Sequence, residues 1–249
     1  MEILLFLTGA GVGTLSGFFG IGGGTVLVPI LLLIGFGMKE AVGISVTQMV
    51  FSSIYGSYLN IKKGSLEFSE GLFVGFGGFV GGYISGYITP YIPTYILQFT
   101  FLGFVIFALI RMLTSKSHQD DSASKTLPKA ILFLIGTGIG VIAISIGVGG
   151  AIVLIPLLAG VLHYPVKKAV SAGLFFVVFS SVAGFLGRIM HSSINLKAGV
   201  IVGIGSLIGV WIGIWLKDRV THHNHKKFIV IMYSIILMIM AYKMFIAQS

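Results

Sequence analysis

Two glycine-rich stretches are the part of this sequence whose residue types and spacing could do chemistry. The first is Gly20-Ile21-Gly22-Gly23-Gly24-Thr25-Val26-Leu27-Val28-Pro29, and the second is Gly147-Val148-Gly149-Gly150-Ala151-Ile152-Val153-Leu154-Ile155-Pro156. Consecutive glycines let a chain turn sharply and leave backbone N–H groups uncovered by side chains. Each stretch is followed by an apolar run that begins like a helix, and the N-terminus of a helix attracts anions. The two stretches therefore predict a pair of anion-binding loops.

Neutral polar side chains near these stretches are the other candidates for binding. Gln48 is the most informative, because a buried amide offers two N–H donors and an acceptor. A Ser or Thr hydroxyl can instead bond to a carbonyl of its own helix, so a structural role is equally compatible with those residues. The predicted substrate-binding residues are Gly22, Gly23, Gly24, Thr25, Gly149, Gly150, Ala151, Gln48, Ser16 and Ser145.

Several other kinds of site lack the residues they require. Cysteine is absent, which removes disulfides and thiolate metal ligands. Every Asp and Glu lies at the end of an apolar run or in a loop, whereas cation transporters and proton pumps usually carry a carboxylate within the membrane. No Ser/His pair, carboxylate pair or metal cluster is placed for catalysis. We therefore expect no catalytic residue, no metal site and no cofactor, and we predict that the protein is not an enzyme.

The composition indicates that the chain is embedded in a lipid bilayer. Of the 249 residues, 56% are hydrophobic and 9% are charged, whereas soluble domains carry about 25% charged residues. The predicted fold is an all-α integral membrane protein, because runs of about 20 apolar residues cross a bilayer. Apolar segments lie at 3–18, 25–37, 41–60, 69–88, 95–114, 130–145, 152–163, 168–190, 198–217 and 227–246. The shorter segments flank the two glycine stretches, where we expect broken helices.

The second half of the chain repeats the first. A shift of 127 residues aligns the two glycine stretches, and a shift of 128 aligns Phe51-Ser52-Ser53 with Phe179-Ser180-Ser181. We predict two transmembrane repeats of about five segments each, at 1–114 and 129–249, joined by a hydrophilic linker at 115–128. Coincidental glycine spacing at helix interfaces is the alternative explanation.

The basic residues predict how the repeats are oriented. The net charge of +9 could suggest nucleic acid, but the basic residues lie in short loops between apolar runs. If each pair of short segments forms a hairpin that returns to its starting side, most of the 16 Lys and Arg fall on one face. That face should be cytoplasmic, which makes the second repeat inverted and both termini extracytoplasmic. If each pair formed one interrupted crossing, the basic residues would divide almost evenly.

The first glycine stretch and the residues before it resemble a known family. Ser16-Gly17-Phe18-Phe19-Gly20-Ile21-Gly22-Gly23-Gly24 followed by Val28-Pro29 resembles the motif of the TauE/SafE sulfite exporter family, also called TSUP. The resemblance spans nearly the whole chain, because both halves carry the unit. The second half departs from the motif, with Ala143-Ile144 in place of the Ser-Gly pair and Ala151 in place of the third glycine. A less open second loop would make the two halves unequal in binding.

The resemblance implies transport of sulfite, sulfonates or other small organosulfur anions across the bacterial cytoplasmic (inner) membrane. We therefore predict a multi-pass transporter that works by alternating access around a midplane site. The expected partners are the anion and the lipid bilayer, without nucleic acid; the sequence leaves a coupling proton or sodium ion and the oligomeric state open. A small-anion channel that uses the same loops as a filter is the leading alternative. An intramembrane enzyme or a membrane scaffold is a second alternative from another class.

Overall fold

The fold was analysed in a computed structural model, which describes residues 1–19, 22–62, 71–114, 128–158, 162, 166–191, 194–217, 219 and 222–246. These residues form ten α-helices and one 3-10 turn, without a strand among them. The elements are α1 (Glu2–Phe19), α2 (Gly24–Ile34), α3 (Met38–Lys62), α4 (Gly71–Ile88), η1 (Thr89–Tyr91), α5 (Thr94–Thr114), α6 (Lys129–Ser145), α7 (Ala151–Pro156), α8 (Val166–His191), α9 (Leu196–Lys217) and α10 (His222–Ile246). The predicted linker at 115–128 lies outside the described residues apart from Pro128.

The prediction of an all-α protein is confirmed, and the broken helices lie beside the glycine stretches. Helix α2 ends sooner than the apolar run does, because Gly35 adopts a left-handed conformation with φ 110°. Its N–H donates to Leu32 O, and the N–H of Phe36 donates to Leu31 O, which closes the helix in a Schellman-type cap. Helix α7 is shorter still, at six residues.

The outer surface of the bundle suits a hydrocarbon environment. Among the described residues, four helical segments are long and apolar enough to cross a membrane: Glu2–Phe19, Gly71–Tyr91, Ala169–His191 and Leu196–Leu216. Large apolar side chains point outward, as Trp211 (57% exposed) and Met238 (72% exposed) illustrate. In water such a surface would be an aggregation liability, whereas lipid covers it without cost.

Each of the two hydrophobic clusters in the core contains residues from both halves. Helix α1 packs along α9, and its repeat equivalent α6 packs along α4. The contacts correspond residue by residue: Gly9 lies against the backbone of Val202, and Gly136 lies against the backbone of Val74. A Cβ atom at either glycine would overlap a carbonyl oxygen, so the close approach of the helices requires glycine. Each contact joins one half of the chain to the other, so neither half packs alone.

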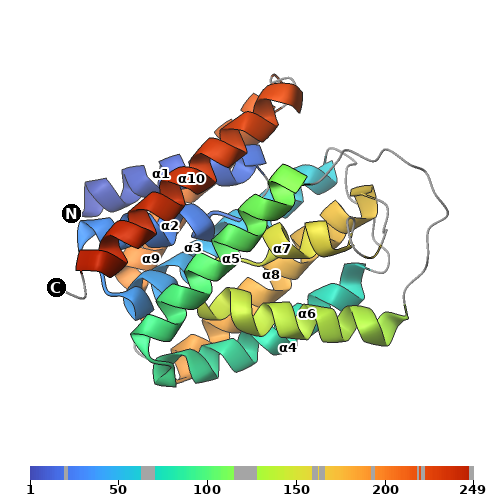
Figure 1. Cartoon of the computed structure of the whole chain (residues 1–249), viewed down its shortest axis with the longest axis horizontal. Coiled ribbons are helices and arrows are strands. Elements are labelled where there is room, and N and C mark those ends of the chain that lie inside the picture. The colour runs from blue at the N-terminus through green and yellow to red at the C-terminus, as the bar shows by residue number, and fades with distance from the viewer. Residues whose placement is uncertain are drawn as a thin grey trace.

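Equivalent helices of the two halves run in opposite directions. Arg188, near the end of α8, lies beside Gly43, near the start of α3. Further back along α8, the Ser181 hydroxyl lies 3.3 Å from that of Ser53, which is further along α3. Helices α3 and α8 are therefore antiparallel, and Ser53 and Ser181 are equivalent residues in the repeat. Figure 1 shows the two helices within one bundle, with the start of α1 and the end of α10 on the same side of the molecule.

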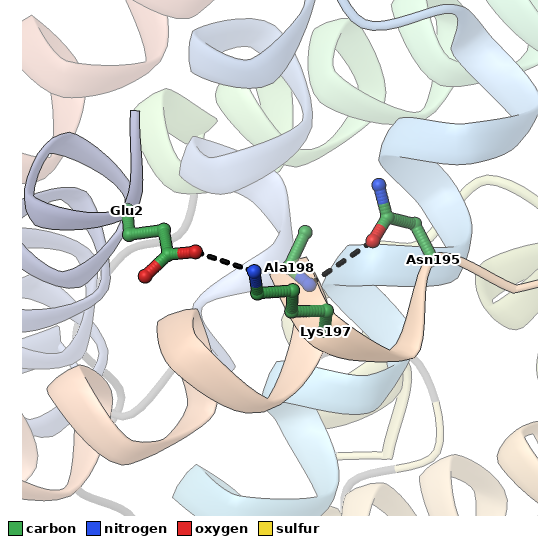
Figure 2. A network of polar contacts seen from close by, with 4 residues as sticks. All are labelled: Glu2, Asn195, Lys197 and Ala198. Carbon is green, nitrogen blue, oxygen red and sulfur yellow. Dashed lines mark hydrogen bonds and ion pairs between the residues drawn. The ribbon is translucent and has the colours of Figure 1, made fainter.

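One end of the bundle gathers the starts of α1, α3 and α9. Lys197, in the first turn of α9, forms an ion pair with Glu2 at the start of α1 (Figure 2). Asn195 caps α9 by accepting a hydrogen bond from the N–H of Ala198 at 3.1 Å, and its amide donates to Glu40 Oε1 at 3.0 Å. Since α1 and α3 begin at the same end, the α1–α2 pair returns to its starting side. The hairpin interpretation requires this arrangement.

Candidate anion-binding site

The two glycine stretches meet inside the bundle. A Cβ atom on Gly24, the first residue of α2, would overlap the carbonyl oxygen of Gly147 in the second stretch. The same carbonyl accepts a hydrogen bond from the hydroxyl of Ser45 at 2.8 Å. Ser45 is fully buried on α3. Helix α3 therefore ties the second loop to the start of α2, and the two stretches form one region of the structure.

Each loop turns through a glycine with positive φ. Gly22 has φ 73°, and its repeat equivalent Gly149 has φ 80°, a conformation that residues with a Cβ rarely adopt. Gly22 faces Val177 of α8, and Gly149 faces Met49 of α3. Met49 and Val177 are themselves equivalent in the repeat. The two turns share this glycine but differ at the helix cap, because Gly23 is right-handed at φ −60° whereas Gly150 is left-handed at φ 66°.

The first loop presents buried polar groups at the start of a helix. Gly23 is the N-cap of α2, and the position of a Cβ on it lies 3.0 Å from both Nε2 and Oε1 of Gln48. Gln48 is fully buried near the middle of the 25-residue helix α3. Neither atom of its amide has a hydrogen-bond partner among the described residues, and the same holds for the hydroxyl of Thr25, which is 1% exposed.

This arrangement is unusual for a purely structural site. More than about 90% of buried polar groups in proteins are hydrogen-bonded, and an unpaired one costs about 1–3 kcal/mol. Within the described part of the chain, the amide of Gln48 and the hydroxyl of Thr25 both lack a partner, and both lie beside the N–H groups at the start of α2. Those N–H groups carry the positive end of the helix dipole. Together they offer hydrogen-bond donors and a partial positive charge to a small anion.

The second loop is more closed. Gly150 is the N-cap of α7 in a left-handed conformation with φ 66°, and it faces the ring of Phe176. The N–H of Ala151, the first of α7, already donates to Gly149 O at 2.9 Å. A six-residue helix also has a smaller dipole than the 11-residue α2. The contacts with the first loop come from Gly147 and Val148, and the predicted residues Gly149, Gly150 and Ala151 offer fewer free donors than the first loop does.

Ser145 and Ser16 lie beside the loops in different surroundings. The hydroxyl of Ser145 lies 2.9 Å from that of Ser85 and accepts a hydrogen bond from Thr89 at 3.1 Å, which links the end of α6 to α4 and η1. Ser16 is half-buried on α1, next to Gly17, which packs against Val210 of α9. Ser145 thus belongs to a hydroxyl cluster with Ser85 and Thr89, and Ser16 lies close to the α1–α9 interface.

Sequence reasoning missed two features of this region. Ser85 and Thr89 gave no signal, because their contact with Ser145 joins segments more than 50 residues apart. From the sequence, Arg188 could attract anions to a mouth or simply set the membrane orientation, and its burial, at 3% exposed near the end of α8, was not predicted. A single arginine within a long apolar span was the available signal, because buried charges in membrane proteins usually mark functional positions. Among the residues that the structure describes, no group of His, Asp and Glu could hold a metal ion.

A lipid-compatible bundle with broken helices and polar groups buried between them defines a polytopic membrane protein of the transporter type. The chain belongs to the family described as sulfite exporter TauE/SafE, whose model matches residues 5–244. It is similar to "Probable membrane transporter protein MJ0441" of Methanocaldococcus jannaschii, with 30% identity over 88% of this chain and 87% of that one. It is also similar to "Probable membrane transporter protein YdhB" of Bacillus subtilis, with 27% identity over 81% and 84% of the two chains. No solved structure matches the chain. The protein is therefore a membrane transporter and not an enzyme.

Proposed function

We propose that this transporter moves a small anion, either sulfite, a sulfonate or another organosulfur anion. The description of the family supports this substrate class. The site chemistry supports it as well, because backbone N–H groups, an amide and a hydroxyl suit clustered anionic oxygens. The observation that carries the proposal is the fully buried amide of Gln48 beside the N-cap of α2, whose two polar atoms have no partner in the part of the chain that the structure describes.

The mechanism that we propose is alternating access around the region where the loops meet. Two repeats of inverted topology would rock against each other and expose this region to one side of the membrane at a time. The antiparallel course of the equivalent helices α3 and α8 supports this arrangement. So does the central place of Gln48 along α3. A midplane site would be reachable from both sides without moving the anion far.

We place the protein in the bacterial cytoplasmic (inner) membrane with both termini extracytoplasmic. Lys62 and Lys129 lie at opposite helix ends from Glu2 and Lys197, as the directions of α3, α6, α1 and α9 require. Most other basic residues share the end with Lys62 in the hairpin interpretation, and cytoplasmic loops are enriched in Lys and Arg.

A small-anion channel remains the second candidate, because the same loops could act as a filter. The two candidates differ in kinetics. A carrier binds its anion in an occluded state, so its flux saturates and a gradient of one anion drives counterflow of another. A channel gives neither counterflow nor a turnover limit. The tight packing of Gly24 on Gly147 favours the carrier, because the two loops are in direct contact there.

The proposal is tested by a thermal-shift screen of the purified full-length protein. The probes are sulfite, sulfate, thiosulfate, ethanesulfonate and taurine, with glycerol and urea as neutral controls. An anion that binds the folded state raises the unfolding temperature in proportion to the logarithm of its concentration. We expect sulfite or a sulfonate to stabilise the protein more than sulfate does. Equal shifts from all the anions at matched ionic strength would contradict a specific site.

A further inference from the structure

The two loops carry different side chains at equivalent positions. In the repeat, Gly23 corresponds to Gly150, and Gln48 corresponds to Phe176. The structure keeps each pair in contact: the Cβ position of Gly23 meets the amide of Gln48, and that of Gly150 meets the ring edge of Phe176. An amide therefore faces the first loop at the place where a phenyl ring faces the second.

The first turns of α2 and α7 differ in the same way, with a polar residue in α2 and an apolar one in α7. Thr25, the second residue of α2, has a buried hydroxyl without a partner among the described residues. Its equivalent in α7 is Ile152, a buried aliphatic residue. The N–H of Ala151 is bonded to Gly149 O, and the described residues show no corresponding bond between Gly24 and Gly22. Three independent features thus make the first loop polar and the second loop apolar.

We infer that each chain binds a single anion at a time, at the first loop, and that the residue at the position shared by Gln48 and Phe176 decides which loop binds. This inference rests on the proposed function and narrows its site. The bound anion accepts hydrogen bonds from Gln48 Nε2, the Thr25 hydroxyl and the N–H groups at the start of α2. The second loop forms an apolar wall beside it and holds no anion.

The energetic reason lies in desolvation. An oxyanion that leaves water must regain hydrogen bonds, because burial without compensation costs several kcal/mol or more. The first loop supplies an amide, a hydroxyl and the end of an 11-residue helix. At the second loop, Phe176 and Ile152 supply no donor, and α7 has only six residues. The two loops are equivalent in the repeat, but only the first supplies the side-chain donors that bind an anion.

Isothermal titration of the full-length protein in detergent tests the inference, with sulfite and ethanesulfonate as probes. Gln48→Leu removes the amide at nearly constant volume, and Phe176→Leu is the matched change in the other half. A second pair, Thr25→Val and Ile152→Val, gives a readout if either first variant fails to fold. Replacing a buried polar group that lacks a partner by an apolar one of similar shape removes the cost of burying it, so Gln48→Leu and Thr25→Val should unfold at or above the wild-type temperature.

We expect one anion per wild-type chain. Gln48→Leu and Thr25→Val should each weaken binding by about tenfold or more, since a hydrogen bond to a charged group contributes that much. Phe176→Leu and Ile152→Val should bind like the wild type. Two anions per chain, or equal losses from changes in both halves, would overturn the single-site inference and leave the proposed function intact. Binding of neither probe by the wild type would refute the proposed function itself, and the inference with it.

Discussion

The hydroxyl of Ser45 donates a hydrogen bond to the carbonyl oxygen of Gly147 at 2.8 Å, across 102 positions of sequence. Ser45 belongs to the first half of the chain and Gly147 to the glycine stretch of the second half. The bond satisfies a carbonyl that no helix uses, and it fixes the second loop against the start of α2. The position of the second loop against the first thus depends on Ser45, a residue of α3 that belongs to neither loop.

Ser45→Ala should destabilise the protein. The substitution leaves the carbonyl of Gly147 buried without this donor, so we expect the free energy of unfolding to fall by about 1–3 kcal/mol. Equilibrium unfolding in mixed micelles measures the change. The matched control is Ser234→Ala, because Ser234 is exposed and bonds only to Val230 O of its own helix. Its effect should stay within about 0.5 kcal/mol, and equal effects of the two variants would refute the role of Ser45.

Gly24→Ala should disrupt the contact between the loops. The added methyl group would overlap the carbonyl oxygen of Gly147 and approach Ser45 Oγ to 2.7 Å. Relief requires backbone movement, so we expect a loss of about 1–3 kcal/mol in stability, as for other overpacked sites. Gly11→Ala is the control, since a Cβ there meets nothing within 4 Å, and alanine favours the helix by up to about 1 kcal/mol. A Gly24→Ala protein as stable as the wild type would contradict the observed packing.

Ser145→Ala separates a structural role from a binding role. Its hydroxyl is bonded to Ser85 and Thr89, so we expect a loss of about 1–2 kcal/mol in the free energy of unfolding. The affinity for sulfite should change by less than about threefold, which titration calorimetry resolves. An unchanged stability together with a strong loss of affinity would instead make Ser145 a direct ligand of the anion.

The sequence was sufficient to predict the helical fold and the broken helices, because both follow from local patterns. Runs of apolar residues specify the helices, and Gly22–Gly24 and Gly149–Gly150 interrupt them. The packing role of Gly75 and Gly203 was also readable from four-residue glycine spacing, and these residues lie against Phe179 and Phe51. Each of these features depends on residues close together in the sequence.

The details of the site were less accessible, because they depend on which distant side chains meet. Gln48 was singled out as a buried amide, but its contact with Gly23, and the contact of Phe176 with Gly150, become visible only in the folded chain. The apolar run 152–163 did not reveal where α7 would end, and the α-helix spans Ala151–Pro156. The burial of Arg188 was missed because charge at a segment end has an alternative explanation in membrane topology.

The most direct test of the account is counterflow of sulfite in proteoliposomes that contain the wild type, Gly23→Val or Gly11→Val. A branched side chain at Gly23 would meet Gln48 and Val12, so it should occupy the space of the anion and abolish counterflow. At Gly11 no atom lies within 4 Å of a Cβ, so Gly11→Val should transport like the wild type. All three proteins must insert and elute as monodisperse species. Normal counterflow by Gly23→Val would contradict the assignment of the site to the first glycine loop.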